Sequence, residues 1–184
     1  MDRIKAVLTL GVAMTLVTTH CMASTNVGTL SFTPSSGDYE SAFGLSLFHI
    51  RDDPVGGYLN FAVTLREREP HYDNLNVDSF GDPVTDRFKE RMVFAIGVTR
   101  RITHAFAVYG GIGYGWGEGK ARKQDPTGIL GDNGRSYYVD DPANDEDGVN
   151  LNFGLLAMTP IGVTLEAGYH SFSSAPYVGA GWSF

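Results

Sequence analysis

The sequence predicts an all-β protein, an eight-stranded antiparallel up-and-down transmembrane β-barrel, from three observations. Eight segments alternate apolar and polar residues with a period of two, which is typical of a strand with one apolar face. The connections between these segments alternate in length, so that the long ones share one end of the barrel. The apolar faces are almost free of charge, as contact with hydrocarbon requires, since Lys or Arg at the bilayer midplane costs roughly 2–4 kcal/mol.

The N-terminal segment, residues 1–23, has the features of a secretory signal peptide. Two basic residues precede an uncharged run from Ala6 to Val17, and Ala23 offers a small residue for cleavage. The run is too short to span a bilayer as a helix, which takes about 20 residues. Lipidation at Cys21 is an alternative. Cleavage after Ala23 would remove the one cysteine of the chain and with it any disulfide.

The remaining residues, 24–184, are predicted to form one domain. The chain has a formal charge of −7 at pH 7. This acidic balance argues against a nucleic-acid partner, which normally requires a basic patch. The sequence has no further hydrophobic run of 18 residues, so a helical membrane protein is excluded.

The eight predicted strands cover residues 26–33, 41–50, 58–66, 91–99, 105–116, 149–157, 163–172 and 176–184. Two polar segments, 67–90 and 117–148, show neither strand nor helix periodicity and are predicted to be long loops. Both fall at odd-numbered connections, whereas the even-numbered connections are short. Outer-membrane barrels have short periplasmic turns and longer extracellular loops, so the two long loops are predicted to be extracellular.

The placement of charged and aromatic residues favours a membrane barrel over a soluble barrel with an apolar interior. After Asp147 the one charged residue is Glu166, which lies on the polar face of its strand. Aromatic residues fall towards the two ends of the apolar faces, where the girdles of membrane barrels lie. They are Tyr114, Trp116, Tyr169, Phe106, Trp182 and Phe184.

The final segment places Val178, Ala180, Trp182 and Phe184 on one face of a strand that ends the sequence. This ending resembles the C-terminal signal of Gram-negative outer-membrane β-barrels, which the barrel-assembly machinery binds. The four residues are therefore predicted to be an assembly signal, with that machinery as a partner. Deletion of Phe184 is expected to reduce folding into the membrane while leaving secretion intact.

Taken together, the signal peptide, the eight alternating segments and the terminal Phe184 resemble the small eight-stranded outer-membrane barrels of the OmpA-transmembrane-domain, OmpX and Opa type. The resemblance implies a bacterial outer-membrane location, contact with outer-membrane lipid and lipopolysaccharide, and a monomer. It is nearly silent about activity. We expect a non-enzymatic protein without cofactors, whose two long loops serve binding, adhesion or envelope integrity through a host or surface ligand.

Polar residues on the inward faces are predicted to form a cluster in the lumen, comprising Arg66, Arg91, Glu166, Asn150 and Asn152. An eight-stranded barrel is just wide enough for its side chains to fill it. The cluster is therefore expected to be a buried plug in which Glu166 is paired with arginine. A narrow channel along the polar lumen is the alternative.

An enzymatic alternative uses Glu166, His170 and Ser173, because lipid A deacylases are eight-stranded outer-membrane barrels with a Ser, a His and an acid. Geometry weakens this hypothesis. Glu166 and His170 are four residues apart on one face, about 13 Å at 3.3 Å per residue. That separation exceeds the hydrogen-bond reach that a catalytic triad needs.

Acidic residues gather near the end of the second long loop and could bind Ca²⁺ through oxygen ligands. The candidate ligands are Asp140, Asp141, Asp145 and Asp147. The spacing is not that of an EF-hand. A solvated acidic loop without metal is the alternative.

Overall fold

The structure is a computed structural model that describes residues 24–52, 55–65, 71–128 and 136–184. The predicted signal peptide, with Cys21, and the predicted lumen residue Arg66 lie outside the described residues. Within the described part of the chain, no helix is long and apolar enough to cross a membrane.

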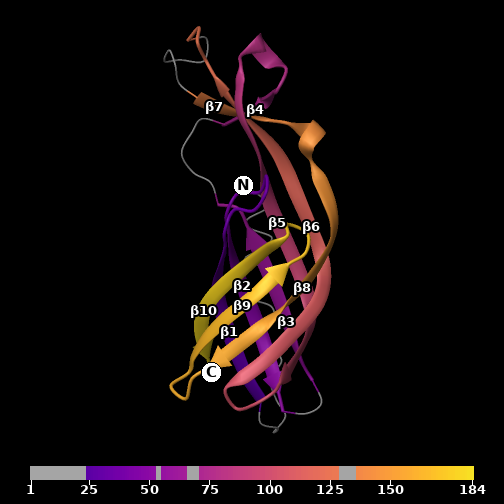
Figure 1. The fold of residues 1–184 in the computed structure, drawn as a ribbon, viewed down its shortest axis with the longest axis vertical. Helices are drawn as coiled ribbons and strands as arrows, with labels where there is room; N and C mark the ends of the chain where they lie inside the picture. Colours follow the sequence, from indigo (N-terminus) through magenta and orange to yellow (C-terminus); the bar gives the residue numbers. More distant parts are fainter. Residues whose placement is uncertain (1–23, 53–54, 66–70, 129–135) are drawn as a thin grey trace.

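Eight strands form a closed ring in which each strand is antiparallel to both of its neighbours (Figure 1). They follow one another in chain order, and the first pairs with the last. The N–H of Phe184 donates to the carbonyl of Asn26 at 2.8 Å and thereby continues this closing pair. The predicted eight-stranded up-and-down barrel is confirmed. The ring strands are β1 (Ser24–Thr33), β2 (Ala42–Arg51), β3 (Gly56–Val63), β5 (Val84–Arg101), β6 (Phe106–Gln124), β8 (Glu146–Met158), β9 (Val163–His170) and β10 (Ala175–Ser183).

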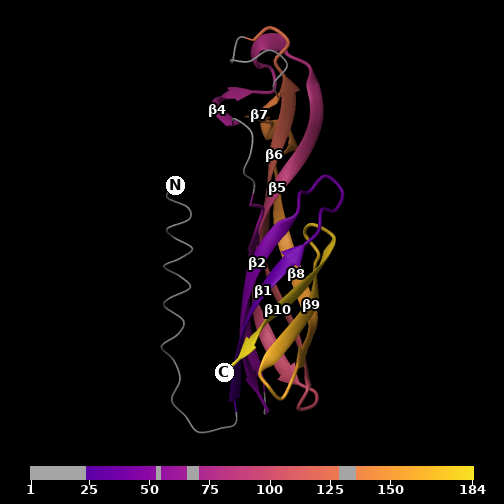
Figure 2. The same ribbon diagram turned by 90° about the vertical axis from the view of Figure 1, so that its left-hand side faces the viewer.

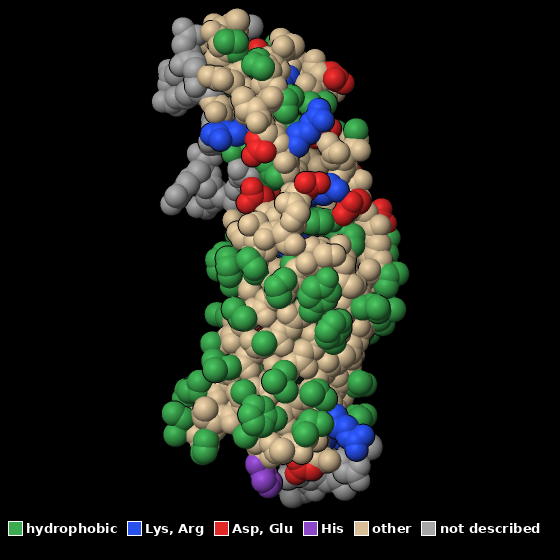
Figure 3. Space-filling view, viewed as in Figure 1, with side chains coloured by type: hydrophobic (Ala, Val, Ile, Leu, Met, Phe, Trp, Pro, Cys, Tyr) green, Lys and Arg blue, Asp and Glu red, His purple; other side chains and the backbone are tan. Residues whose placement is uncertain are grey.

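The barrel carries its polar residues inside and its large apolar residues outside. On β1, Thr29 and Ser31 are buried, whereas Leu30 is 71% exposed and Phe32 is 41% exposed. Figure 3 shows hydrophobic side chains spread over the barrel wall and charged side chains near its two ends. A continuous apolar surface of this size is stable only against another apolar phase. Other outward-facing members are Phe43, Leu45, Ile96, Val98, Ile112, Leu151, Phe153, Leu165 and Val178.

Side chains fill the lumen. Near the short turns they are mainly apolar, and Phe48 packs on Tyr109 with 5.0 Å between ring centroids. Tyr109 in turn packs on Tyr58, also at 5.0 Å. This packing agrees with the interior width expected for eight strands. The cluster comprises Val27, Phe48, Ile50, Tyr58, Ala95, Ala107, Tyr109, Leu156, Met158 and Tyr177.

Two ring strands continue well beyond the barrel and extend the sheet there by two further strands (Figures 1 and 2). β3 pairs with β5 only over residues 92–99, and β8 pairs with β6 only as far as Gly117. Beyond those points β5 and β6 pair with each other. β7 (Ser136–Asp140) adds to β6, and β4 (His71–Asn76) lies parallel to β7. We call the outer ends of β5 and β6, with β7 and β4, the protruding sheet.

The protruding sheet corrects the expectation that 67–90 and 117–148 contain no strand. Its small core consists of Ala121, Tyr137 and Val139, with Tyr72, Leu75 and Val77 packed against it. The sequence did not show the apolar–polar alternation of these strands because a charged residue, Lys123, is fully buried two residues after the buried Ala121. Two short 3₁₀ turns, Ser79–Gly81 and Pro142–Asn144, complete this region.

Candidate functional site: the lumen network and the protruding sheet

Glu166 lies buried in the lumen and accepts hydrogen bonds from three hydroxyl groups. Ser46 Oγ lies 3.0 Å and 3.2 Å from its two carboxyl oxygens, and the Tyr109 hydroxyl donates at 3.0 Å. Thr29 also donates to it. One carboxyl group therefore connects four strands, β1, β2, β6 and β9. Arg91 is not the expected partner of Glu166, since its hydrogen bonds go to Glu40, Pro34 and Ser173. A pairing with Arg66 stays a prediction, because that residue lies outside the described residues.

The network continues from Glu166 towards the outer end of the lumen. The hydroxyl groups of Tyr109 and Tyr177 lie 2.7 Å apart, and Asn152 Nδ2 donates to Tyr177 at 3.0 Å. The same amide lies 3.0 Å from His170 Nδ1, and Asn150 Nδ2 lies 3.4 Å from that nitrogen. The His170 ring also stacks on Tyr177, with 4.4 Å between centroids. Most of the buried polar groups in this part of the lumen are thus hydrogen-bonded to neutral donors and acceptors.

Arg91 forms a separate set of hydrogen bonds at the outer rim of the barrel. Its Nε donates to the Glu40 carbonyl at 2.9 Å and its Nη2 donates to the Pro34 carbonyl at 2.9 Å. Its Nη1 donates to Ser173 Oγ at 2.8 Å. The guanidinium is buried and lies 5.3 Å from the centre of the Tyr39 ring. Arg91 therefore fixes the turn between β1 and β2 to the turn between β9 and β10.

The three weak catalytic candidates do not form a triad in the described structure. Glu166 is bonded to Ser, Thr and Tyr hydroxyls, and His170 is bonded to asparagine amides. Ser173 accepts from Arg91. A serine nucleophile needs a base within hydrogen-bond reach, and none of the hydrogen bonds of Ser173 in the described structure leads to His170.

The four aspartates proposed as Ca²⁺ ligands have separate partners. Asp140 contacts Lys120 at 2.7 Å, whereas Asp141 lies 3.3 Å from Arg87. Each of the other two accepts from a group in β6: Asp145 from the Gly119 N–H at 2.8 Å, and Asp147 from the Tyr114 hydroxyl. No group of three or more potential metal-ligating side chains is found in the part of the chain that the structure describes. Ca²⁺ binding by these aspartates therefore has no geometric support.

The ion pair between Lys120 and Asp140 links the adjacent strands β6 and β7. Burial alone would raise the pKa of the Asp140 carboxyl, but the hydrogen bonds and charges of Lys120 and His71 together outweigh it and lower that pKa. For Lys120, burial alone would lower the pKa, but the hydrogen bond to Asp140 and the charges of Asp140, Glu90 and Glu118 together outweigh it and raise the pKa. The two shifts agree in sign and indicate a pair that is charged at neutral pH.

Basic side chains of the protruding sheet are held by groups of the protein. Lys89 pairs with Glu146 at 2.7 Å, and Arg87 lies beside Asp141. Lys123 is fully buried and donates to the carbonyls of Val77 and Ser79 at 2.8 Å and 2.5 Å. These cations therefore stabilise the protruding sheet through contacts within the protein.

The outer turn of the protruding sheet presents an exposed aromatic side chain in a strained backbone. Phe80 is 51% exposed and has a φ of 59°, a left-handed conformation that a residue with a side chain rarely adopts. Lys123 donates to the Ser79 carbonyl in this turn. The Tyr137 hydroxyl donates to Asp82 at 2.7 Å. Sequence reasoning missed both Phe80 and Lys123. The signal in the sequence was Phe80 itself, an aromatic residue followed by Gly81 within a polar segment, which is typical of an exposed turn.

The predicted assembly residues all lie on the outer face of β10 or at its end. Val178, Ala180, Trp182 and Phe184 are exposed, and the alternate residues of the strand face inward. Their role in assembly stays a prediction.

The sequence matches no protein-family model and no curated protein. The fold is similar to that of Ail, the attachment invasion locus protein of Yersinia pestis. A structure of Ail in complex with the heparin analogue sucrose octasulfate has 20% sequence identity and a TM-score of 0.51. A structure of Ail without that analogue has 16% identity and a TM-score of 0.50. Each alignment covers 88% of this chain and 96% of the other. The likeness concerns the fold, that of the small eight-stranded outer-membrane barrels.

Proposed function

We propose that this protein is a non-enzymatic outer-membrane β-barrel whose protruding sheet binds a partner at the bacterial surface, in adhesion or in maintaining the envelope. The protruding sheet carries the proposal. It continues two strands of the barrel, has a small core of its own and holds its outer turn with the buried Lys123. A rigid sheet with an exposed aromatic tip presents a preorganised contact surface.

The membrane location is supported by the apolar outer wall and by the similarity in fold to Ail. In this arrangement the short turns face the periplasm and the protruding sheet faces outward. The chain reaches the membrane by secretion and is inserted by the barrel-assembly machinery, which reads the outer face of β10. It acts as a monomer in contact with outer-membrane lipid and lipopolysaccharide.

The charges of the protruding sheet favour a protein partner over a polysulfated glycan. Ail has been solved in complex with a heparin analogue. In this chain Lys89, Lys120 and Arg87 are paired with carboxylates, so a sulfate would have to compete with them. Asp78 and Asp82 flank Phe80. The tip therefore suits an apolar pocket that has basic groups at its rim.

The test is attachment of cells that display the protein to a monolayer of cultured epithelial cells. Phe80→Ser removes the aromatic tip and is expected to reduce attachment severalfold. Val55→Ser is the matched control, because Val55 is similarly exposed but lies at the opposite end of the barrel. Equal attachment by Phe80→Ser and wild type, at equal surface display, would contradict binding through the tip. A heparin-coated surface run in parallel should retain neither variant nor wild type above background.

A further inference from the structure

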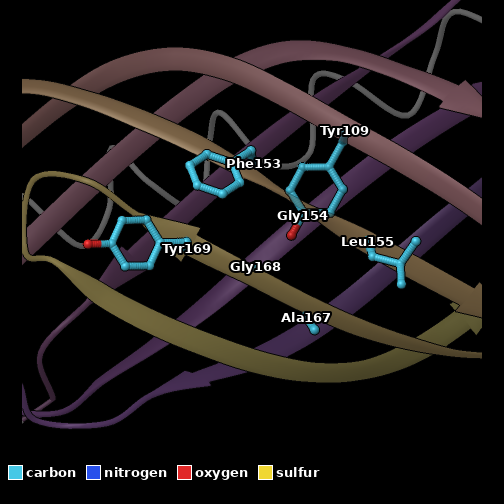
Figure 4. Close-up of a pocket in the computed structure, with 7 residues that line it drawn as sticks. All are labelled: Tyr109, Phe153, Gly154, Leu155, Ala167, Gly168 and Tyr169. Carbon is cyan, nitrogen blue, oxygen red and sulfur yellow. The ribbon is translucent and has the colours of Figure 1, made fainter.

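A groove of about 500 Å³ lies on the outer wall of the barrel between β8 and β9 (Figure 4). Phe153 and Tyr169 form one end, with 5.6 Å between their ring centroids, and Leu155 lies at the other end. Ala167 and Gly168 form the floor. Phe153 and Leu155 belong to the apolar surface of the barrel, so the groove opens into the same phase as that surface.

The groove exists because small residues meet across two strands. Gly154 pairs with Gly168, and Leu155 pairs with Ala167. At the glycines the inner side of the wall is closed by Tyr109. A Cβ atom at Gly154 would lie 2.3 Å from the Tyr109 hydroxyl, and one at Gly168 would lie 2.4 Å from it. Because these two glycines have no side chain, Tyr109 can pack directly against the inner side of the wall. On the outer side, the small side chain of Ala167 leaves the groove open.

The surroundings of the groove restrict what it can hold. Tyr169 points its hydroxyl towards the turn between β9 and β10, at the outer end of the barrel (Figure 4). From residue 148 to residue 184 the sequence contains no Lys or Arg, and the nearest charges at the outer end of β8 are the carboxylates of Glu146 and Asp147. A headgroup rich in phosphate would find no cation among residues 148–184 of this wall, and at the outer end of β8 the cation Lys89 is already paired with Glu146.

We propose that the groove binds one acyl chain of a zwitterionic phospholipid. The chain lies along Ala167 between Phe153 and Leu155, and the Tyr169 hydroxyl meets the polar end of the lipid. Tyrosine suits that position, because its ring is apolar and its hydroxyl remains in the interface. The site rests on the membrane location in the proposed function and is independent of partner binding by the protruding sheet.

The full chain in nanodiscs of phosphatidylethanolamine and phosphatidylcholine, with a trace of phosphatidylethanolamine carrying a diazirine in one acyl chain, tests the site. After illumination, crosslinked peptides are mapped by mass spectrometry. Crosslinks are expected to be about tenfold denser on residues 153–155 and 167–169 than on the opposite wall of β2 and β3, a difference of about 1.4 kcal/mol. Crosslinks spread evenly over all outer walls would overturn the proposal.

Two variants sharpen the test. Ala167→Phe fills the groove and should abolish the enrichment. Ala157→Phe adds the same bulk to an outward position of β8 outside the groove, beside the short turn to β9, and should leave the enrichment intact. An enrichment that survives Ala167→Phe overturns the site. If that variant does not fold, the wild-type map decides alone.

Two further outcomes separate the parts of the argument. Added lipopolysaccharide is expected not to compete, and displacement of the labelled phospholipid by it would overturn the headgroup assignment. Failure of the wild-type chain to enter nanodiscs at all would instead contradict the membrane location, and with it the proposed function.

Discussion

At the scale of the residue, the barrel depends on a carboxyl group whose partners are neutral. Glu166 accepts from Thr29, Ser46 and Tyr109, which stand on three other strands. Replacing it with leucine leaves these buried hydroxyls without their acceptor, at about 1–3 kcal/mol for each group that stays unsatisfied. Glu166→Leu is therefore predicted to lower the free energy of unfolding by about 2–4 kcal/mol.

Urea unfolding in lipid vesicles, followed by the loss of folded mobility in gel electrophoresis, measures this change. Glu166→Gln keeps an acceptor oxygen at nearly the same position and should be less destabilised than Glu166→Leu. A leucine variant as stable as wild type would mean that the carboxyl is not required for stability.

The pair of Lys120 and Asp140 predicts how the stability of the protruding sheet depends on pH. The pKa of Asp140 is lowered in the folded state, so its contribution is present above the pKa of the unfolded carboxyl and is lost as pH falls through the folded pKa. The pKa of Lys120 is raised, so its contribution is lost only as pH rises through that folded value. Since Asp140 is partly exposed, the pair is worth about 1 kcal/mol or less.

Hydrogen exchange of the amides in β6 and β7 should therefore be slower in wild type than in Lys120→Met at pH 7, after correction for intrinsic rates. At a lower pH, at which the Asp140 carboxyl has taken up its proton, the difference should shrink. A difference that is equal at both values of pH would assign the effect of the substitution to lost packing.

At the scale of the element, Lys123 is predicted to determine the shape of the outer turn. Lys123→Met keeps the aliphatic volume but removes the donor to the carbonyls of Val77 and Ser79. The turn should open, and proteolysis between residues 77 and 82 should become severalfold faster while the barrel stays folded. Gln124→Met is the control, because the neighbouring side chain is exposed. Equal cleavage of both variants would show that the turn does not need Lys123.

The elements also show where sequence reasoning succeeds and where it does not. The ring strands were predictable because the bilayer requires an apolar residue at every second position, as in Leu30 and Phe32 on β1. The protruding sheet lies outside that constraint. Its strands are set by pairing with the ends of β5 and β6, and a buried Lys123 interrupts the pattern. The same limit applies in the lumen, where polarity placed Glu166 and Asn152 inside but could not choose their partners.

At the scale of the whole molecule, the lumen residues Glu166 and His170 and the rim residue Ser173 do not form a catalytic triad in the described structure. Lipid A extracted from cells with and without the protein is predicted to have the same mass profile. The reason is that His170 and Ser173 are held by Asn152 and Arg91 respectively. A gained or lost acyl chain that disappears in His170→Ala and Ser173→Ala would contradict this prediction and establish the hydrolase alternative.

The filled lumen leads to a prediction about conduction. Ions entering from the outer side would meet the tyrosine network around Glu166 and then the apolar layer that contains Phe48 and Leu156. Passing a hydrated ion through that layer would require burying its charge against apolar groups, at a cost of several kcal/mol. Planar bilayers that contain the folded protein should therefore stay sealed at all voltages. Tyr109→Ala should also remain sealed, because Phe48, Leu156 and the rest of the apolar layer stay in place. Phe48→Ala combined with Tyr109→Ala removes two packed rings of that layer, so leakage should first appear in this double variant. Stepwise conductance by the wild-type protein would show that the lumen opens, and would favour the channel alternative.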